Sequence, residues 1–162
     1  GILVQDMGRG TFTGNEVSGC GLAGVAVSSR HPETVFRVTS CTDNAEAGML
    51  VYGKGVPSIS GAKLLRNKVA GLVVLEESDP RVTGSQMRDN QGCGVLLDSS
   101  ARGHLRLCHV HNNALAGIAI KGGADTIIED STVTEGRDAG VVVYDGGLGT
   151  LRDCVIEGNA LA

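Results

Sequence analysis

Two stretches of the sequence, GRDAGVVVYDGG at residues 136–147 and NALAGIAIKGG at residues 113–123, share one pattern. In each stretch, alanine and glycine precede a short apolar run, and the two glycines, Gly117 and Gly140, occupy the same place in the pattern. The pattern continues toward the N-terminus, so the chain consists of seven repeats of 23 or 24 residues. These repeats begin at Gly1, Gly24, Gly48, Gly71, Gly94, Gly117 and Gly140, and positions are numbered from this glycine after one inserted residue in the second repeat is skipped.

Positions 2 and 4 are apolar in all seven repeats, and a spacing of two residues between apolar side chains is typical of a β-strand. Positions 12 and 17 form two further apolar columns. Helical repeats, with units of about 33 to 47 residues, and leucine-rich repeats do not fit this spacing. The sequence therefore predicts an all-β fold: a single parallel β-helix domain spanning residues 1–162, with seven coils of three short strands each.

Position 20 is asparagine in five of the seven repeats. Stacked asparagines can bond side chain to side chain along a turn, as they do in other stacked β structures. None of the five has serine or threonine two residues later, which excludes the glycosylation motif. We therefore expect a structural ladder of Asn44, Asn67, Asn90, Asn113 and Asn159.

The composition restricts the classes of partner. Lys and Arg total 14 against 18 for Asp and Glu, without a basic cluster, so we expect no nucleic-acid partner. No apolar run approaches the roughly 18 residues of a transmembrane helix, and no signal-peptide pattern is present, so we expect no membrane partner. The five cysteines are an odd number and lack the C-x-x-C spacing of metal sites, which favours reduced thiols and a cytoplasmic location. We also expect the chain to be a fragment of a longer repeat protein.

The run Gly140–Val143, followed by Cys154, Ile156 and Asn159, resembles the repeat of the right-handed parallel β-helix in the pectin-lyase-like superfamily. The resemblance covers essentially the whole chain. Residues 121–162 resemble more narrowly the β-helix repeats of F-box ubiquitin-ligase adaptors and of carbohydrate-binding and sugar-hydrolase-type proteins. The resemblance implies a right-handed coil, which the general bias of parallel crossovers also favours. It also implies that a site, where present, lies on the outward side of one sheet.

Position 5 lies on the outward side of the first predicted strand and carries the candidate polar residues. Glu76, at position 6, with Asp98 and Lys121, offers carboxylates and an amine to a lyase or hydrolase. Tyr52 and Tyr144 are the aromatic side chains that remain for contact with a sugar ring. The alternative interpretation is a solvated strip in which Asp98 and Lys121 form a cross-strand pair.

Position 3 is apolar in every repeat although strand alternation places it outside. It predicts either an interaction face or an aliphatic ladder that only stabilises the sheet. The interaction face comprises Leu3, Leu50, Tyr52, Val73, Leu96, Val142 and Tyr144.

From this face we expect a non-enzymatic scaffold that binds a protein partner, or associates with itself through the stripe or the open ends of the rod. The alternatives are a carbohydrate-binding or carbohydrate-active module of the lyase, hydrolase or epimerase type, and an architectural spacer. Enzymatic activity stays open and is the less favoured possibility. His109 and His111 share an outward face but have no third ligand in the adjoining repeats, so we expect no metal and no cofactor.

Overall fold

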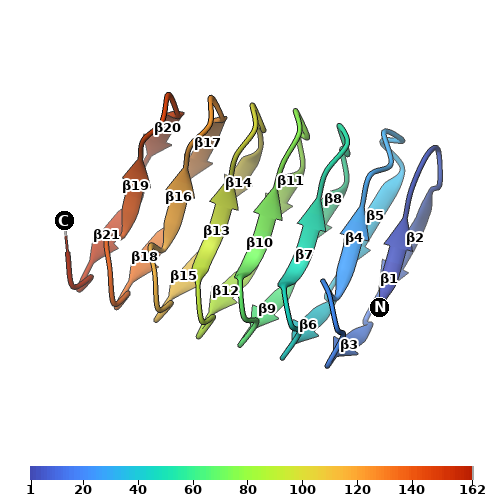
Figure 1. Cartoon of the computed structure of the whole chain (residues 1–162), viewed down its shortest axis with the longest axis horizontal. Helices are drawn as coiled ribbons and strands as arrows, with labels where there is room; N and C mark the ends of the chain where they lie inside the picture. Colours follow the sequence, from blue (N-terminus) through green and yellow to red (C-terminus); the bar gives the residue numbers. More distant parts are fainter. Residues whose placement is uncertain (162) are drawn as a thin grey trace.

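The computed structural model describes residues 1–161 and shows seven coils stacked into one rod (Figure 1). Each coil supplies one strand to each of three seven-stranded parallel sheets. The first sheet consists of β1 (Ile2–Val4), β4 (Val25–Val27), β7 (Ala47–Val51), β10 (Ala70–Val74), β13 (Cys93–Leu97), β16 (Ile118–Ile120) and β19 (Val141–Val143). The second consists of β2 (Gly10–Thr13), β5 (Thr34–Arg37), β8 (Ser58–Ser60), β11 (Arg81–Thr83), β14 (His104–Arg106), β17 (Asp125–Glu129) and β20 (Leu148–Arg152). The third consists of β3 (Glu16–Ser18), β6 (Ser40–Thr42), β9 (Lys63–Leu65), β12 (Gln86–Arg88), β15 (His109–His111), β18 (Thr132–Thr134) and β21 (Val155–Glu157).

The strand register brings equivalent positions of successive coils together, which confirms the predicted all-β parallel fold. In the first sheet Leu72 lies opposite Val95, and in the second Val82 lies opposite Leu105. All four side chains are buried, and they belong to one continuous core. The core is therefore a stack of like on like, in which each coil covers the apolar side chains of the next. Among residues 1–161, no helix is long and apolar enough to cross a membrane.

The inserted residue of the second repeat lies in the turn between β4 and β5. In the first sheet Leu3 pairs with Ala26, whereas in the second sheet Thr11 pairs with Val35, so the sequence interval between partners is longer there by the inserted residue. The turn therefore absorbs the insertion, and both sheets keep their register on either side of it.

An asparagine ladder runs along the turn that follows the third sheet. The Nδ2 atom of Asn44 donates to Oδ1 of Asn67 at 2.9 Å, and Asn90 donates in the same way to Asn113 at 2.9 Å. The glycine of position 1 lies against this ladder. A Cβ atom on Gly94 would lie 2.7 Å from Nδ2 of Asn113, so the repeated glycine is a packing requirement.

The ladder is interrupted in the sixth coil, where position 20 is Gly136. Toward the C-terminus, the backbone N–H of Gly136 donates to Oδ1 of Asn159 at 2.9 Å. Toward the N-terminus, the Nδ2 atom of Asn113 donates to the Met87 carbonyl at 3.0 Å, but glycine at position 136 offers it no side-chain acceptor. The fully buried Asn113 therefore borders a missing rung.

All five cysteines lie within the described residues, and all five are free thiols. Burial raises the pKa of Cys41 to about 12, with a smaller contribution from the neighbouring Cys20. Cys41 is therefore a protonated core side chain rather than a reactive thiol. The cytoplasmic location inferred from the unpaired thiols stays a prediction.

Candidate functional site

The outward face of the first sheet carries the apolar side chains of position 3. Leu50, Val73 and Leu96 are neighbours across β7, β10 and β13. They pack with Ala70 into a small apolar cluster outside the main core. Val73 is 6% exposed, whereas Leu3, at one end of the row, is 59% exposed. The middle of this row is therefore covered by its own neighbours.

The charged candidate side chains at positions 5 and 6 of this face contact one another or the backbone. The amine of Lys121 lies 3.1 Å from a carboxylate oxygen of Asp98. The hydrogen bond to Asp98, the Asp98 charge and nearby Tyr144 together raise the pKa of Lys121. Glu76 accepts a hydrogen bond from the backbone N–H of Gly53 at 3.0 Å. The structure thus joins Asp98 to Lys121, and a catalytic role for Glu76, Asp98 and Lys121 stays a prediction.

The two tyrosines of this face lie far apart along the rod. Tyr52 belongs to the third coil and Tyr144 to the seventh, so four rungs of about 4.8 Å separate them by roughly 19 Å. Tyr52 lines a mainly apolar hollow with Leu3, Leu22 and Leu50. One sugar ring cannot contact both tyrosines.

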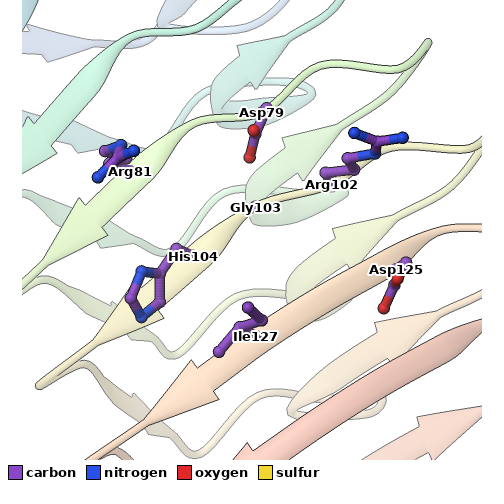
Figure 2. Close-up of a pocket in the computed structure, with 7 residues that line it drawn as sticks. All are labelled: Asp79, Arg81, Arg102, Gly103, His104, Asp125 and Ile127. Carbon is purple, nitrogen blue, oxygen red and sulfur yellow. The ribbon is translucent and has the colours of Figure 1, made fainter.

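The outward face of the second sheet is charged and hollowed. A cavity of about 330 Å³ extends there across the fourth, fifth and sixth coils. Its lining repeats once per coil in two rows, which Figure 2 shows crossing three successive coils. One row consists of Asp79, Arg102 and Asp125, and the other of Arg81, His104 and Ile127.

Four charged side chains of this cavity have no partner among the described residues. Asp79, Arg81, Arg102 and Asp125 form no ion pair and no side-chain hydrogen bond with any group in residues 1–161. A guanidinium group can donate two parallel hydrogen bonds to a carboxylate, and a carboxylate can accept hydrogen bonds from hydroxyl groups. The cavity therefore offers donors and acceptors of both signs to a polar ligand.

His104 is held at the cavity by a hydrogen-bonded chain on the same face. Its Nε2 atom lies 2.9 Å from Glu129, and Glu129 also accepts a hydrogen bond from Arg152 at 3.0 Å. These bonds, that from His104 first, lower the pKa of Glu129. An ionised Glu129 requires a proton on Nε2, so Nδ1 is the acceptor of the neutral His104 ring.

The histidines of the third sheet bond to the next coil instead. The Nδ1 atom of His109 lies 3.0 Å from the Thr132 hydroxyl, and that of His111 lies 3.2 Å from the Thr134 hydroxyl. Glu135 approaches His111 at 3.8 Å. Within residues 1–161, no three His, Cys, Asp or Glu side chains gather into a group that could hold a metal ion.

The candidate residues predicted from the sequence lie on the first and third sheets, so the prediction missed this cavity. Its signal was present in part, because Asp79, Arg102 and Asp125 recur once per repeat with alternating charge. The spacing alone does not show that these charges lack partners. The Asp98 and Lys121 side chains have the same spacing and pair with each other.

The fold matches that of a known protein family. A family model described as "Right handed beta helix region" matches residues 1–127 and 65–162, which together cover the whole chain. The chain belongs to this right-handed β-helix family. The match confirms the handedness and the repeat that the sequence resemblance predicted. No curated protein sequence matches this β-helix significantly.

Three solved structures illustrate what this β-helix resembles. The periplasmic alginate epimerase AlgG has a TM-score of 0.79 at 13% identity, over 91% of this chain and 39% of that chain. The mannuronan C-5 epimerase AlgE6 A-module of Azotobacter vinelandii has a TM-score of 0.68 at 14% identity, over 94% of this chain and 57% of that chain. Pectate lyase Pel9A has a TM-score of 0.61 at 12% identity, over 94% of this chain and 54% of that chain. The β-helix therefore spans 39% to 57% of the length of these three chains.

These comparisons contradict the scaffold function expected from the sequence. All three similar structures are carbohydrate-active proteins, which favours the carbohydrate alternative over a protein-interaction scaffold. The physical reason for the error is the position 3 stripe. An exposed apolar stripe indicates a partner, but Val73 and Ala119 are only 6% and 3% exposed and are covered within the sheet itself. At 12% to 14% identity the likeness shows the fold alone.

Proposed function

We propose that this β-helix is a carbohydrate-recognition module that binds an acidic polysaccharide in the cavity of the second sheet. The observation that carries the proposal is the group of four charged side chains that line one cavity and have no partner within residues 1–161: Asp79, Arg81, Arg102 and Asp125. Support comes from the similar structures, whose names specify alginate, mannuronan and pectate. These three polysaccharides carry carboxylates on their sugar units.

The two rows of the cavity suit the two kinds of group on an acidic sugar. Arg81 and Arg102 can each bind a sugar carboxylate through a pair of parallel hydrogen bonds. Asp79 and Asp125 can accept hydrogen bonds from sugar hydroxyls. Ile127, which is 39% exposed, offers an apolar surface to the C–H face of a sugar ring. A neutral sugar leaves both guanidinium groups without an anionic partner, so it binds more weakly.

A second candidate function is proton transfer on the bound sugar, as in a lyase or an epimerase. The observation that favours it is the orientation of His104 by Glu129 at 2.9 Å. A neutral imidazole with a fixed tautomer can accept a proton, and a neighbouring arginine can stabilise the negative charge that develops on the sugar carboxylate. In this proposal His104 is the base and Arg102 the electrostatic group.

Calorimetric titration with polymannuronate, polygalacturonate and neutral dextran tests the binding proposal. We expect the two acidic polymers to bind and dextran not to bind. Arg102→Ala should lower the affinity about tenfold, because it removes a charge-assisted contact of roughly 1.5 kcal/mol. Arg37→Ala is the matched control, since Arg37 is exposed on the same sheet outside the cavity. Equal binding of dextran, or equal loss in both variants, contradicts the proposal.

Incubation with polymannuronate tests the second candidate. An unsaturated product detected by ultraviolet absorbance indicates a lyase, and a changed C5 configuration detected by proton NMR indicates an epimerase. We expect His104→Gln to abolish either product while most of the binding affinity remains. Binding by the parent chain without any product rejects proton transfer and leaves the recognition proposal intact.

A further inference from the structure

A second hollow lies on the outward face of the second sheet, at the first and second coils, on the same face as the first cavity. It has a volume of about 520 Å³ and is lined by Arg9, Gly10, Thr11, Pro32, Glu33 and Val35. Thr11 and Val35 occupy the row that continues as Arg81 and His104 in the first cavity. Both hollows are therefore parts of one straight row along the rod axis.

The third coil connects the two hollows without obstructing the row. Ser58 pairs with Val35 on one side and with Arg81 on the other, so it is the outward residue of this row in the third coil. The coil carries no charged side chain between Gly55 and Ser60, and Pro57 is buried. The row is thus continued between the two hollows by a small hydroxyl side chain.

The distances along the rod suit a linear polymer. The second and fourth coils are two rungs apart, which corresponds to roughly 10 Å at about 4.8 Å per rung. From the first to the sixth coil the row extends over five rungs, or roughly 24 Å. A short oligosaccharide in one hollow cannot occupy the whole row, whereas a longer chain can.

The second hollow contains groups of the same chemistry as the first. The Nη1 atom of Arg9 lies 3.3 Å from Oε2 of Glu33 and 3.4 Å from Nε2 of His31. The side chains of Arg9 and Glu33 are 63% and 69% exposed, and such a pair contributes little to stability, so a ligand carboxylate can take the place of Glu33. Pro32 and Val35 supply an apolar floor next to this arginine.

We infer that one linear acidic glycan chain lies along the rod axis and occupies both hollows, with Ser58 beneath its middle. This inference rests on the proposed function, because it extends the same binding site. It assigns a second subsite, centred on Arg9, that contacts only ligands long enough to reach the first coil. Binding should therefore depend on chain length, since the second contact becomes intramolecular once the first is made.

Titration with a mannuronate disaccharide, tetrasaccharide and octasaccharide tests the inference. We expect the octasaccharide to bind at least tenfold more tightly than the disaccharide. Arg9→Ala should weaken octasaccharide binding about fivefold and leave disaccharide binding unchanged. Arg102→Ala should weaken binding of every length, because Arg102 belongs to the first cavity.

A matched pair of variants on β8 tests the path between the hollows. Ser58→Glu places a negative charge beneath the middle of the glycan and should weaken octasaccharide binding about tenfold. Disaccharide binding should fall less, because for this short ligand the new charge acts only through the adjacent Arg81. Ser60→Glu, on the same strand but outside the row, should change either affinity less than twofold. Circular dichroism checks that both variants keep the β fold.

The outcomes separate the inference from the proposed function. Affinity that is independent of length, or equal losses in Ser58→Glu and Ser60→Glu, overturns the second subsite while a loss in Arg102→Ala still supports the first. If mannuronate of no length binds, the proposed function fails for this polymer and the inference fails with it.

Discussion

The outward faces of the first and second sheets are built from the same repeat and differ in how their side chains are satisfied. On the first sheet, aliphatic side chains cover one another, and Asp98 neutralises Lys121. On the second sheet, Asp79 and Arg102 occupy equivalent positions of adjacent coils, line a cavity and form no ion pair with any of the residues that the structure describes. In a rod whose coils resemble one another, a ligand site is therefore recognised by groups that the neighbouring coils leave unsatisfied.

Replacing one residue of each face by aspartate should give the largest difference in stability between the two faces. Val73→Asp buries an unpaired carboxylate in the covered stripe and should lower the free energy of unfolding by about 3 kcal/mol. Ile127→Asp changes an outward side chain that is 39% exposed and should cost less than about 0.5 kcal/mol. Urea unfolding followed by circular dichroism measures both values.

The same two variants should have the opposite order of effect on glycan binding. Ile127→Asp adds a negative charge to the cavity and should weaken binding of an acidic glycan, while folded Val73→Asp should bind like the parent chain. A Val73→Asp variant as stable as the parent would mean that the stripe is an open surface, which removes the contrast between the two faces.

The pH dependence of stability should distinguish paired from unpaired charges within the second face. The pKa of Glu129 is lowered from its usual 4.5 by hydrogen bonds from His104 and Arg152. Its stabilising contribution is therefore complete above pH 4.5 and is lost as the pH falls through the lower folded-state pKa. Glu129→Gln should show a shallower loss of stability between pH 5 and pH 3 than the parent chain.

Urea midpoints at several pH values measure this effect, with Arg37→Ala as the control on the same sheet. A Glu129→Gln variant that loses stability as steeply as the parent would show that the chain from His104 to Arg152 does not hold the carboxylate ionised. The tautomer assigned to His104 would then lose its support.

The fold was predictable because each buried column is repeated in seven coils. Position 4 is Val, Leu or Ile at every occurrence, so no single residue decides the result. The single insertion does not disturb the prediction, because it falls between β4 and β5 and is absorbed by a turn. Parallel stacking then follows from the need of each coil to cover the next.

The candidate site was not predictable in the same way, because it depends on only three coils and on side-chain geometry. The intervals from Asp98 to Lys121 and from Asp79 to Arg102 are equal, and only the structure shows that the first pair forms an ion pair. The partner of His104 is Glu129, which lies off the row. Repeat spacing alone therefore cannot separate a structural ion pair from a ligand-binding charge.

The smallest effect should be a gain of stability from completing the interior ladder. Gly136→Asn should place an amide between Asn113 and Asn159 and raise the free energy of unfolding by about 1 kcal/mol, the usual value of a buried hydrogen bond. The new Cβ would lie 2.9 Å from Oδ1 of Asn159, the outer end of a side chain, so a small shift of that side chain can accommodate it. Urea unfolding of this variant beside the parent chain measures the gain.

This variant also tests whether the structural and ligand-binding parts of the rod are separable. Gly136 lies in the turn after the third sheet, away from both hollows, so Gly136→Asn should leave glycan affinity unchanged while stability rises. Gly136→Ala is the control, because it adds the Cβ without the amide and should give no comparable gain. Equal stabilisation by both variants would assign the effect to reduced freedom of the unfolded chain, since replacing glycine restricts that state as well. A gain of stability in Gly136→Asn but not in Gly136→Ala would show that each asparagine of the ladder stabilises the rod through its own side-chain hydrogen bonds.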